Sequence, residues 1–272
     1  MTSKAVVYTI NQNNIELVGT SLFSLIKHYD SEESLSILLL VDDIVEKDIT
    51  ILRAFSQAMK KEQIEISVWQ MPQELNQITS FKVDVGPIRY HLTKFFLPRY
   101  FSDFEEIIYL DAETLVLGNI AEYFCAFTDE YAMGLVKKIR GTKNSQANSE
   151  SFNSDSIIFN TQEYNQRFSV DDLITTINTC STETTMNELT YQIFKENSQF
   201  LPANFNVTDA NEAFEAERYE QECIVKNFKC SVEKNKPWNH LALLNNWDRE
   251  FWINFTEMKS LVFKVHNNAE SF

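Results

Sequence analysis

Two acidic residues, Asp111 and Glu113, follow directly after the apolar run Ile107–Leu110. If that run is a strand, residues two apart point to the same side, so the two carboxylates form a fork of oxygens where the strand ends. Carboxylate oxygens suit hard divalent cations such as Mg²⁺ and Mn²⁺, which in turn hold phosphates. The spacing alone favours a solvated turn, because such short motifs often occur without function. The flanking sequence therefore has to decide between a metal site and a turn.

Composition and charge limit the class of protein. The 272 residues are 44% hydrophobic, which is enough for one large domain, or for one domain with a small appendage. Neither G-x-G-x-x-G nor G-x-x-x-x-G-K followed by Ser or Thr occurs, so the sequence has no glycine-rich phosphate loop. The net charge of −15 opposes binding to nucleic acids and to anionic lipids. An anionic substrate would need local cations or a metal ion.

The cysteines and the N-terminus predict the compartment. No C-x-x-C pair occurs, and the cysteines are sparse for a disulfide scaffold: Cys125, Cys180, Cys223 and Cys230. Met1 is followed almost at once by a strand-like segment, and no apolar run of about 18 residues occurs. We expect reduced thiols, no signal peptide and no transmembrane segment in a cytoplasmic protein, with peripheral binding to the inner face of the cell membrane as the alternative. The low glycine content, with many Asn and Lys, suggests a bacterial source.

The first 110 residues alternate between apolar runs and helical patterns. The predicted strands are Ala5–Ile10, Leu35–Val41, Ile64–Trp69 and Ile107–Leu110. The predicted helices are Glu16–His28, Ile44–Lys61 and Tyr90–Tyr100, the last one interrupted around Pro98. This alternation predicts an open α/β sheet of parallel strands, in which ligands bind at the carboxyl ends of the strands. Asp111 and Glu113 lie at such an end.

The rest of the chain continues without a repeat or a clear linker. Lys137–Ser151 is polar and predicts a loop, either a solvated one or a lid over an anionic ligand. Further predicted elements are the strands Ser156–Phe159 and Lys226–Val232 and the helices Asp171–Ile177 and Asn187–Glu196. The aromatic tail Trp247–Phe263 is expected to pack on the core. We expect a single domain over residues 1–272, with an aromatic helical segment from about residue 241; the oligomeric state is not indicated.

Several short sequence blocks resemble segments of one protein family and occur in the same order along the chain. The blocks are Leu92-Thr93-Lys94, Tyr109–Ile120, Phe152-Asn153-Ser154-Asp155, Leu201-Pro202 with Asn206, and Lys236-Pro237-Trp238-Asn239. They are similar to the L-T-K, M-D-A-D-T-L-V-L-A-N-I, F-N-S-G, L-P…N and K-P-W-N segments of glycosyltransferase family 8, the family of glycogenin and bacterial lipooligosaccharide galactosyltransferases. The ordered matches cover most of the chain.

The resemblance implies a GT-A fold, a single Rossmann-like domain with a mostly parallel central sheet flanked by helices. It implies transfer of a hexose from a UDP-sugar, with retention at the anomeric carbon, to a saccharide, lipid-linked or protein-linked acceptor. The diphosphate leaving group gains negative charge as the glycosidic bond breaks, and a divalent ion, Mn²⁺ or Mg²⁺, would stabilise it.

The resemblance also implies roles for individual residues. The donor would contact Tyr8, Thr9, Asn11, Lys94, Asp111, Ala112, Asn153, Ser154 and Lys236. The first three would edge the uracil and ribose, Lys236 would contact the diphosphate, and Asn153 and Ser154 would contact the sugar. The metal ligands would be Asp111, Glu113 and the residue at the position of a family histidine, which is Cys230 here.

Other positions depart from the family pattern. The acidic and amide pair that meets the donor sugar falls on Met186 and Asn187, with Glu183 or Glu188 as candidate replacements for the acid. We therefore take Asp111, Asn187 and Glu188 as the candidate catalytic residues.

Further departures lie in the blocks themselves. Asp155 and Glu233 replace family glycines, and His240 is a candidate for a displaced third metal ligand. Two functions remain open. The first is an active transferase with an altered site, which the retained residues favour. The second is a degenerate relative that binds a partner or a nucleotide without turnover, which the net charge of −15 favours.

Overall fold

The computed structural model describes most of the chain. The described residues are 3–42, 44, 46–79, 86–137, 152–181, 184–208, 222–229, 233–240, 242–243 and 245–269. Cys230, Glu183 and nearly all of the predicted loop Lys137–Ser151 lie outside them.

A seven-stranded sheet in the order β3-β2-β1-β4-β7-β6-β8 forms the centre of the molecule. Its strands are β1 Lys4–Ile10, β2 Leu35–Val41, β3 Ile64–Gln70, β4 Glu106–Leu110, β6 Met133–Lys137, β7 Phe152–Asn160 and β8 Ser198–Leu201. Strands β3, β2, β1 and β4 are parallel neighbours, as are β6 and β8, while β7 runs antiparallel to β4 and β6. The sheet is thus mostly parallel, as predicted.

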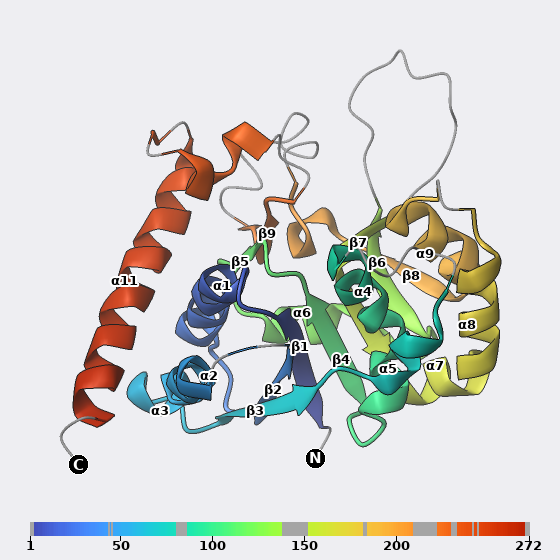
Figure 1. Ribbon diagram of the computed structural model, residues 1–272, viewed down its shortest axis with the longest axis horizontal. Helices are drawn as coiled ribbons and strands as arrows, with labels where there is room; N and C mark the ends of the chain where they lie inside the picture. The colour runs from blue at the N-terminus through green and yellow to red at the C-terminus, as the bar shows by residue number, and fades with distance from the viewer. Residues whose placement is uncertain are drawn as a thin grey trace.

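Helices cover both faces of this sheet (Figure 1). One layer contains α1 Ile15–His28, α2 Glu46–Arg53, α3 Phe55–Ala58 and α11 Asn246–Ala269. The other contains α4 Gly86–Thr93, α5 Leu97–Tyr100, α7 Thr161–Arg167, α8 Val170–Thr179 and α9 Met186–Phe194. A short helix, α6 Ala121–Ala126, follows the first strand of a two-stranded antiparallel sheet of β5 Thr114–Val116 and β9 Val225–Asn227.

The alternation of side chains along β1 explains the two layers. Val6, Tyr8 and Ile10 pack with the residues of α1 on one face, and Ala5 and Val7 pack on the other. All five are buried, so β1 is apolar on both sides, which is typical of a central parallel strand.

The structure corrects two predicted elements. The single helix Ile44–Lys61 is wrong, because α2 ends at Arg53 and α3 begins at Phe55; Lys60 then adopts a positive φ of 58°, which ends the helical path. The predicted strand Lys226–Val232 is also wrong in extent, since β9 ends at Asn227.

Other elements agree more closely. Tyr90–Tyr100 is helical but divided into α4, a 3₁₀ turn and α5, which carries Pro98 in its first turn, where the missing N–H is tolerated. The aromatic tail forms α11, which packs against α1. None of the helices in the described part of the chain is both long enough and apolar enough to cross a membrane.

Candidate functional site

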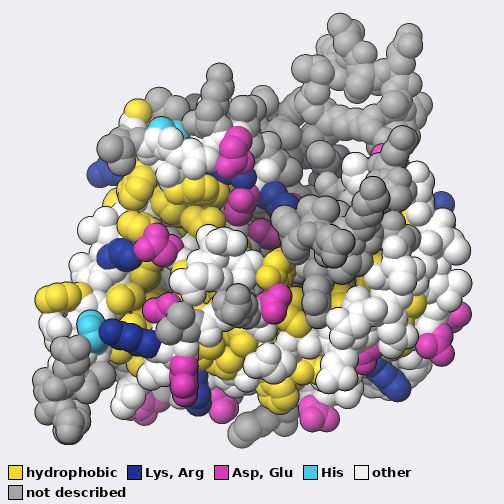
Figure 2. Space-filling model, in the orientation of Figure 1, with side chains coloured by type: hydrophobic (Ala, Val, Ile, Leu, Met, Phe, Trp, Pro, Cys, Tyr) yellow, Lys and Arg dark blue, Asp and Glu magenta, His cyan; other side chains and the backbone are white. Residues whose placement is uncertain are grey.

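A cavity of about 460 Å³ lies at the carboxyl ends of the central strands. Five residues that the sequence assigned to a site line it: Thr9, Asn11, Asp111, Ala112 and Glu113. The loops after parallel strands β1 and β4 emerge at the same edge of the sheet, which is why residues a hundred positions apart meet here. Figure 2 shows acidic and basic side chains side by side on this face, over the region of β5 and β9.

Asp111 is the buried carboxylate at the centre of the site. Its Oδ2 accepts a hydrogen bond from Lys229 Nζ at 3.0 Å, and its Oδ1 accepts the backbone N–H of Glu113 at 3.2 Å. His91 Nδ1 lies 3.6 Å from Oδ2. Burial alone would raise the pKa of Asp111, but the charge of Lys229, aided by His91, outweighs it and lowers the pKa to about 2. Asp111 is therefore ionised at neutral pH.

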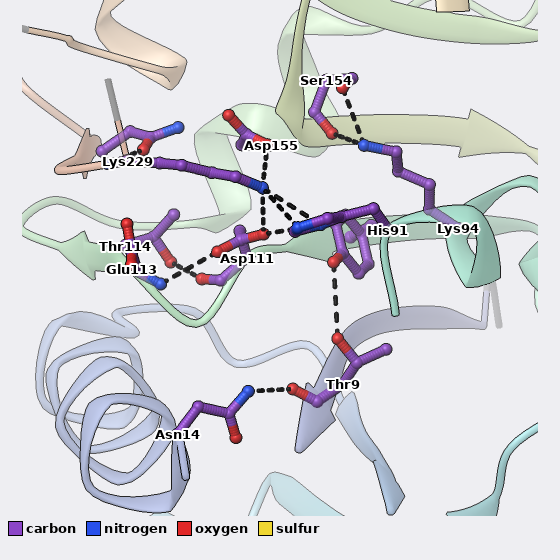
Figure 3. Close-up of polar contacts among 12 residues, drawn as sticks. Thr9, Asn14, His91, Lys94, Asp111, Glu113, Thr114, Ser154, Asp155 and Lys229 are labelled. Atoms are coloured by element: carbon purple, nitrogen blue, oxygen red, sulfur yellow. Dashed lines mark hydrogen bonds and ion pairs between the residues drawn. The ribbon is translucent and has the colours of Figure 1, made fainter. Parts of the chain in front are cut away.

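Lys229 enters the site between two carboxylates (Figure 3). Its Nζ donates to Asp111 and, at 2.9 Å, to Asp155 Oδ1, and lies 3.1 Å from His91 Nδ1. Burial would lower the pKa of Lys229, but the two carboxylates outweigh burial and raise it. Burial and the charge of Lys229 lower the pKa of His91 to about 4, so its ring is neutral at pH 7. Lys229 is the fixed positive charge of this cluster.

Glu113 pairs with a different lysine. Lys236 Nζ donates to Glu113 Oε1 at 2.9 Å and to the exposed Glu233 at 2.8 Å. Glu113 Oε2 is buried and has no hydrogen-bond partner among the residues that the structure describes. Burial raises the pKa of Glu113, and the contact with Lys236 opposes this. Glu113 Oε2 can therefore accept a hydrogen bond from a ligand.

A third lysine, Lys94, connects the predicted donor residue Ser154 to the candidate catalytic residue Asn187. Lys94 is fully buried and donates to Ser154 O at 2.6 Å and to Ser154 Oγ at 2.8 Å. Ser154 Oγ in turn donates to Asn187 Oδ1 at 2.9 Å. Burial lowers the pKa of Lys94 to about 7, against the opposing effect of Asp155. The L-T-K and F-N-S blocks and the start of α9 are thus joined by one chain of hydrogen bonds.

The remaining predicted residues have local partners. Asn153 is buried, and its Oδ1 accepts the backbone N–H of Asp155 at 3.2 Å. Glu188 closes a capping box at the start of α9, where its Oε2 accepts from the backbone N–H and the hydroxyl of Thr185, each at 2.9 Å. Tyr8 is buried in the core, with its hydroxyl 3.0 Å from that of Ser21, and does not line the cavity.

His240 lies apart from the carboxylate pair. Its Nε2 is 3.2 Å from Asn235 O and 4.0 Å from Asp248 Oδ2 on α11, and it is not among the residues lining the cavity. Met186 begins α9 and packs against the core cluster beneath it.

Sequence reasoning did not assign the partners of Asp111. Lys229, His91 and Asp155 form the charged cluster, and Tyr90, whose hydroxyl donates to Asp42 Oδ2 at 3.0 Å, lines the cavity beside it. One signal was available: Asp155 replaces a family glycine, and Lys229 directly precedes the family histidine position.

An open, mostly parallel sheet with a polar cavity at its strand ends is the arrangement in which nucleotide-binding α/β proteins hold their ligands. The chain belongs to the family described as Glycosyl transferase family 8, whose sequence model matches residues 5–242. The protein is accordingly a glycosyltransferase by family and fold.

Solved glycosyltransferases share the fold at low sequence identity. The WbbM bifunctional enzyme superposes with a TM-score of 0.72 at 15% identity, covering 96% of this chain and 52% of WbbM, so this chain spans about half of WbbM. LgtC in complex with donor and acceptor sugar analogues gives 0.69 at 15% identity, covering 93% and 95%. GlyE from Streptococcus pneumoniae TIGR4 gives 0.69 at 17% identity, covering 99% and 64%. No curated protein matches the sequence significantly. The neighbours confirm the GT-A fold.

The family resemblance implies a divalent metal ion, so the question is whether the side chains present could coordinate one. Asp111 and Glu113 both face the cavity, but each already accepts from a lysine, Lys229 or Lys236. Within the described ranges, no group of three His, Cys, Asp or Glu residues is placed to hold a metal ion. Cys230 lies outside those ranges, and its role stays a prediction. The described side chains, as they are arranged, do not fit a divalent ion.

Proposed function

We propose that this protein transfers a hexose from a UDP-sugar to a saccharide, lipid-linked or protein-linked acceptor, with retention at the anomeric carbon. Family membership supports sugar transfer. The observation that carries the proposal is the polar cavity in which Asp111 and Lys229 meet at the carboxyl ends of β1 and β4.

The nucleoside would bind where β1 ends. Asn11 Oδ1 accepts the backbone N–H groups of Asn13 and Asn14, and Asn14 Nδ2 donates to Thr9 O at 3.3 Å, which fixes the turn. Thr9, Asn11 and Asn14 all line the cavity. Backbone and amide groups held this way suit the polar edge of uracil, and Tyr90 supplies an aromatic side chain beside them.

The diphosphate would lie against Lys229, with Lys236 near the other carboxylate. The bond that breaks joins the anomeric carbon to the diphosphate oxygen, so negative charge grows on the diphosphate. A cation placed in advance and partly shielded from solvent, as Lys229 is, stabilises this charge more strongly than it would in bulk water. No step of this mechanism passes through a metal ion.

The sugar would face Ser154 and Asn187. Ser154 Oγ donates to Asn187 Oδ1, and the buried Lys94 donates to Ser154. We propose Asp111 and Asn187 as the residues that contact the reacting part of the donor. The carboxylate of Glu188 is held by Thr185 at the first turn of α9. We therefore assign Glu188 to positioning the helix that carries Asn187.

A donor screen tests the proposal. UDP-hexoses are titrated into the protein by calorimetry, and hydrolysis or transfer is followed by NMR, which also reports the anomeric configuration of the product. We expect UDP to bind and one UDP-hexose to turn over with the anomeric configuration retained. Binding without turnover of any donor would support the degenerate relative instead, and failure of UDP to bind under any condition would remove the proposal.

A further inference from the structure

One ammonium group occupies the place where a metal ion is expected. Lys229 Nζ lies 3.0 Å from Asp111 Oδ2 and 2.9 Å from Asp155 Oδ1, and both carboxylate side chains are below 10% exposed. The side chain of Lys229 itself is 28% exposed and lines the cavity. The cation is therefore held from behind by two carboxylates and presented to the ligand space in front.

A departure from the family pattern takes part in this contact. Asp155 stands where the resembling F-N-S-G block has glycine, and Lys229 directly precedes the position of the family histidine. The two residues are 74 positions apart in the chain, yet their charged atoms are in contact. The acid that replaces the glycine therefore supplies the second carboxylate that holds Lys229.

The carboxylates that a divalent ion would need are already paired with lysines. Asp111 and Asp155 both accept from Lys229, and Glu113 accepts from Lys236. A divalent ion at Asp111 would have to displace an ammonium that two buried carboxylates hold, at a large loss of pairing.

We infer that Lys229 is the resident cation that neutralises the diphosphate of the donor, so that donor binding needs no divalent metal ion. This inference rests on the proposed function. The ammonium has three hydrogens. Two are directed to Asp111 and Asp155, and the third is directed to His91, 3.1 Å away. A phosphate oxygen is a stronger acceptor than a neutral ring nitrogen, so it can take the third hydrogen while both carboxylates keep theirs.

Calorimetry with UDP tests the inference on the wild-type chain. Metal-free protein is titrated with UDP in EDTA and again with Mn²⁺ in excess. We expect the two dissociation constants to agree within about twofold. Binding that is lost in EDTA and restored by Mn²⁺ would overturn the inference and leave the proposed function intact. No binding in either buffer would remove both.

Lys229→Met separates the charge from the fold. We expect this variant to bind UDP at least about tenfold more weakly in EDTA, while uridine, which has no phosphate, binds as it does to wild type. With Lys229 gone, the freed carboxylates should allow Mn²⁺ to strengthen UDP binding. Equal weakening of uridine and UDP, or unchanged UDP binding, would contradict the assignment.

Lys27→Met is the matched control. Lys27 pairs with Glu257 at 2.8 Å between α1 and α11 and does not line the cavity. The Lys27→Met variant loses the same charge as Lys229→Met, but its UDP affinity should stay at the wild-type value. A loss comparable to that of Lys229→Met would show that overall charge, and not the position of Lys229, controls binding. If Lys229→Met does not fold, the two wild-type titrations still decide the question.

Discussion

Two lysines near the same cavity, the partly buried Lys229 and the fully buried Lys94, are in opposite electrostatic states (Figure 3). Burial lowers the pKa of both. At Lys229 the carboxylates of Asp111 and Asp155 outweigh burial and raise the pKa, whereas Lys94 donates to Ser154 oxygens and its pKa falls to about 7. One lysine is a fixed cation, and the other loses its charge near neutrality. The direct partners, more than the depth of burial, decide whether a lysine can act as a charge here.

Asp111→Asn gives the largest expected effect, because it removes the carboxylate that holds Lys229 and faces the donor. We expect the rate of sugar transfer to fall by about 10³-fold, which corresponds to about 4 kcal/mol in the barrier. Steady-state rates with the UDP-hexose selected by the donor screen measure it. Asp171→Asn, an exposed change on α8, is the control and should keep the full rate. A rate for Asp111→Asn within tenfold of wild type would contradict a central role for this residue.

Lys94→Met tests whether the pKa of Lys94 is lowered, through the pH dependence of stability. The pKa of Lys94 is about 7 in the folded protein, whereas an unperturbed lysine, as in the unfolded chain, has a pKa of 10.5. Between pH 7 and pH 10.5 the unfolded state binds one more proton than the folded state, so the free energy of unfolding of the wild type rises with pH. The cost of burying Lys94 in its charged form is complete below pH 7 and disappears towards pH 10.5. Relative to wild type, Lys94→Met should lack a gain of about 3 kcal/mol between pH 7 and pH 10. Urea unfolding at both pH values measures it. Parallel pH profiles of variant and wild type would show that Lys94 keeps its charge.

The sequence predicted the first half of the fold well, because strands such as Leu35–Val41 are apolar on both faces and are separated by helical patterns. The strands β6 and β8 were missed. Strand β8 has only four residues, and β6 contains Gly134, where an added Cβ would come within 2.6 Å of Ile158. Close approach of the backbone, and not an apolar pattern, explains a glycine in this strand.

The site was predicted only where local pattern determines it. Asp111 and Glu113 directly follow a predicted strand, and residues that follow a parallel strand lie at the carboxyl edge of the sheet. Lys229 has no such pattern, because its two carboxylate partners lie 118 and 74 residues away. Only the folded chain brings this lysine to them, so its role could not be read from spacing.

Glu188→Gln separates helix capping from catalysis. Gln can keep the capping-box bond to Thr185 while it removes the charge, so we expect unfolding free energy within about 0.5 kcal/mol of wild type and a retained transfer rate. Glu188→Ala loses the cap and should be less stable by about 1 kcal/mol. Thermal or urea unfolding and initial rates measure both. A folded Glu188→Gln protein that fails to transfer sugar would instead make this carboxylate catalytic.

Lys27→Met gives the smallest expected effect and is the baseline for the variants of Lys94 and Lys229. Lys27 and Glu257 are 36% and 47% exposed, so solvent screens their contact and a surface pair of this kind contributes about 0–1 kcal/mol. We expect urea unfolding to show a loss within that range, and the loss should shrink further in about 1 M salt, where the screening length is roughly 3 Å. A larger loss that persists in high salt would mean that the packing of the lysine stem between α1 and α11, and not its charge, stabilises this contact. In that case neutralising a lysine would not isolate its charge, and the variants of Lys94 and Lys229 would have to be compared with Arg replacements instead.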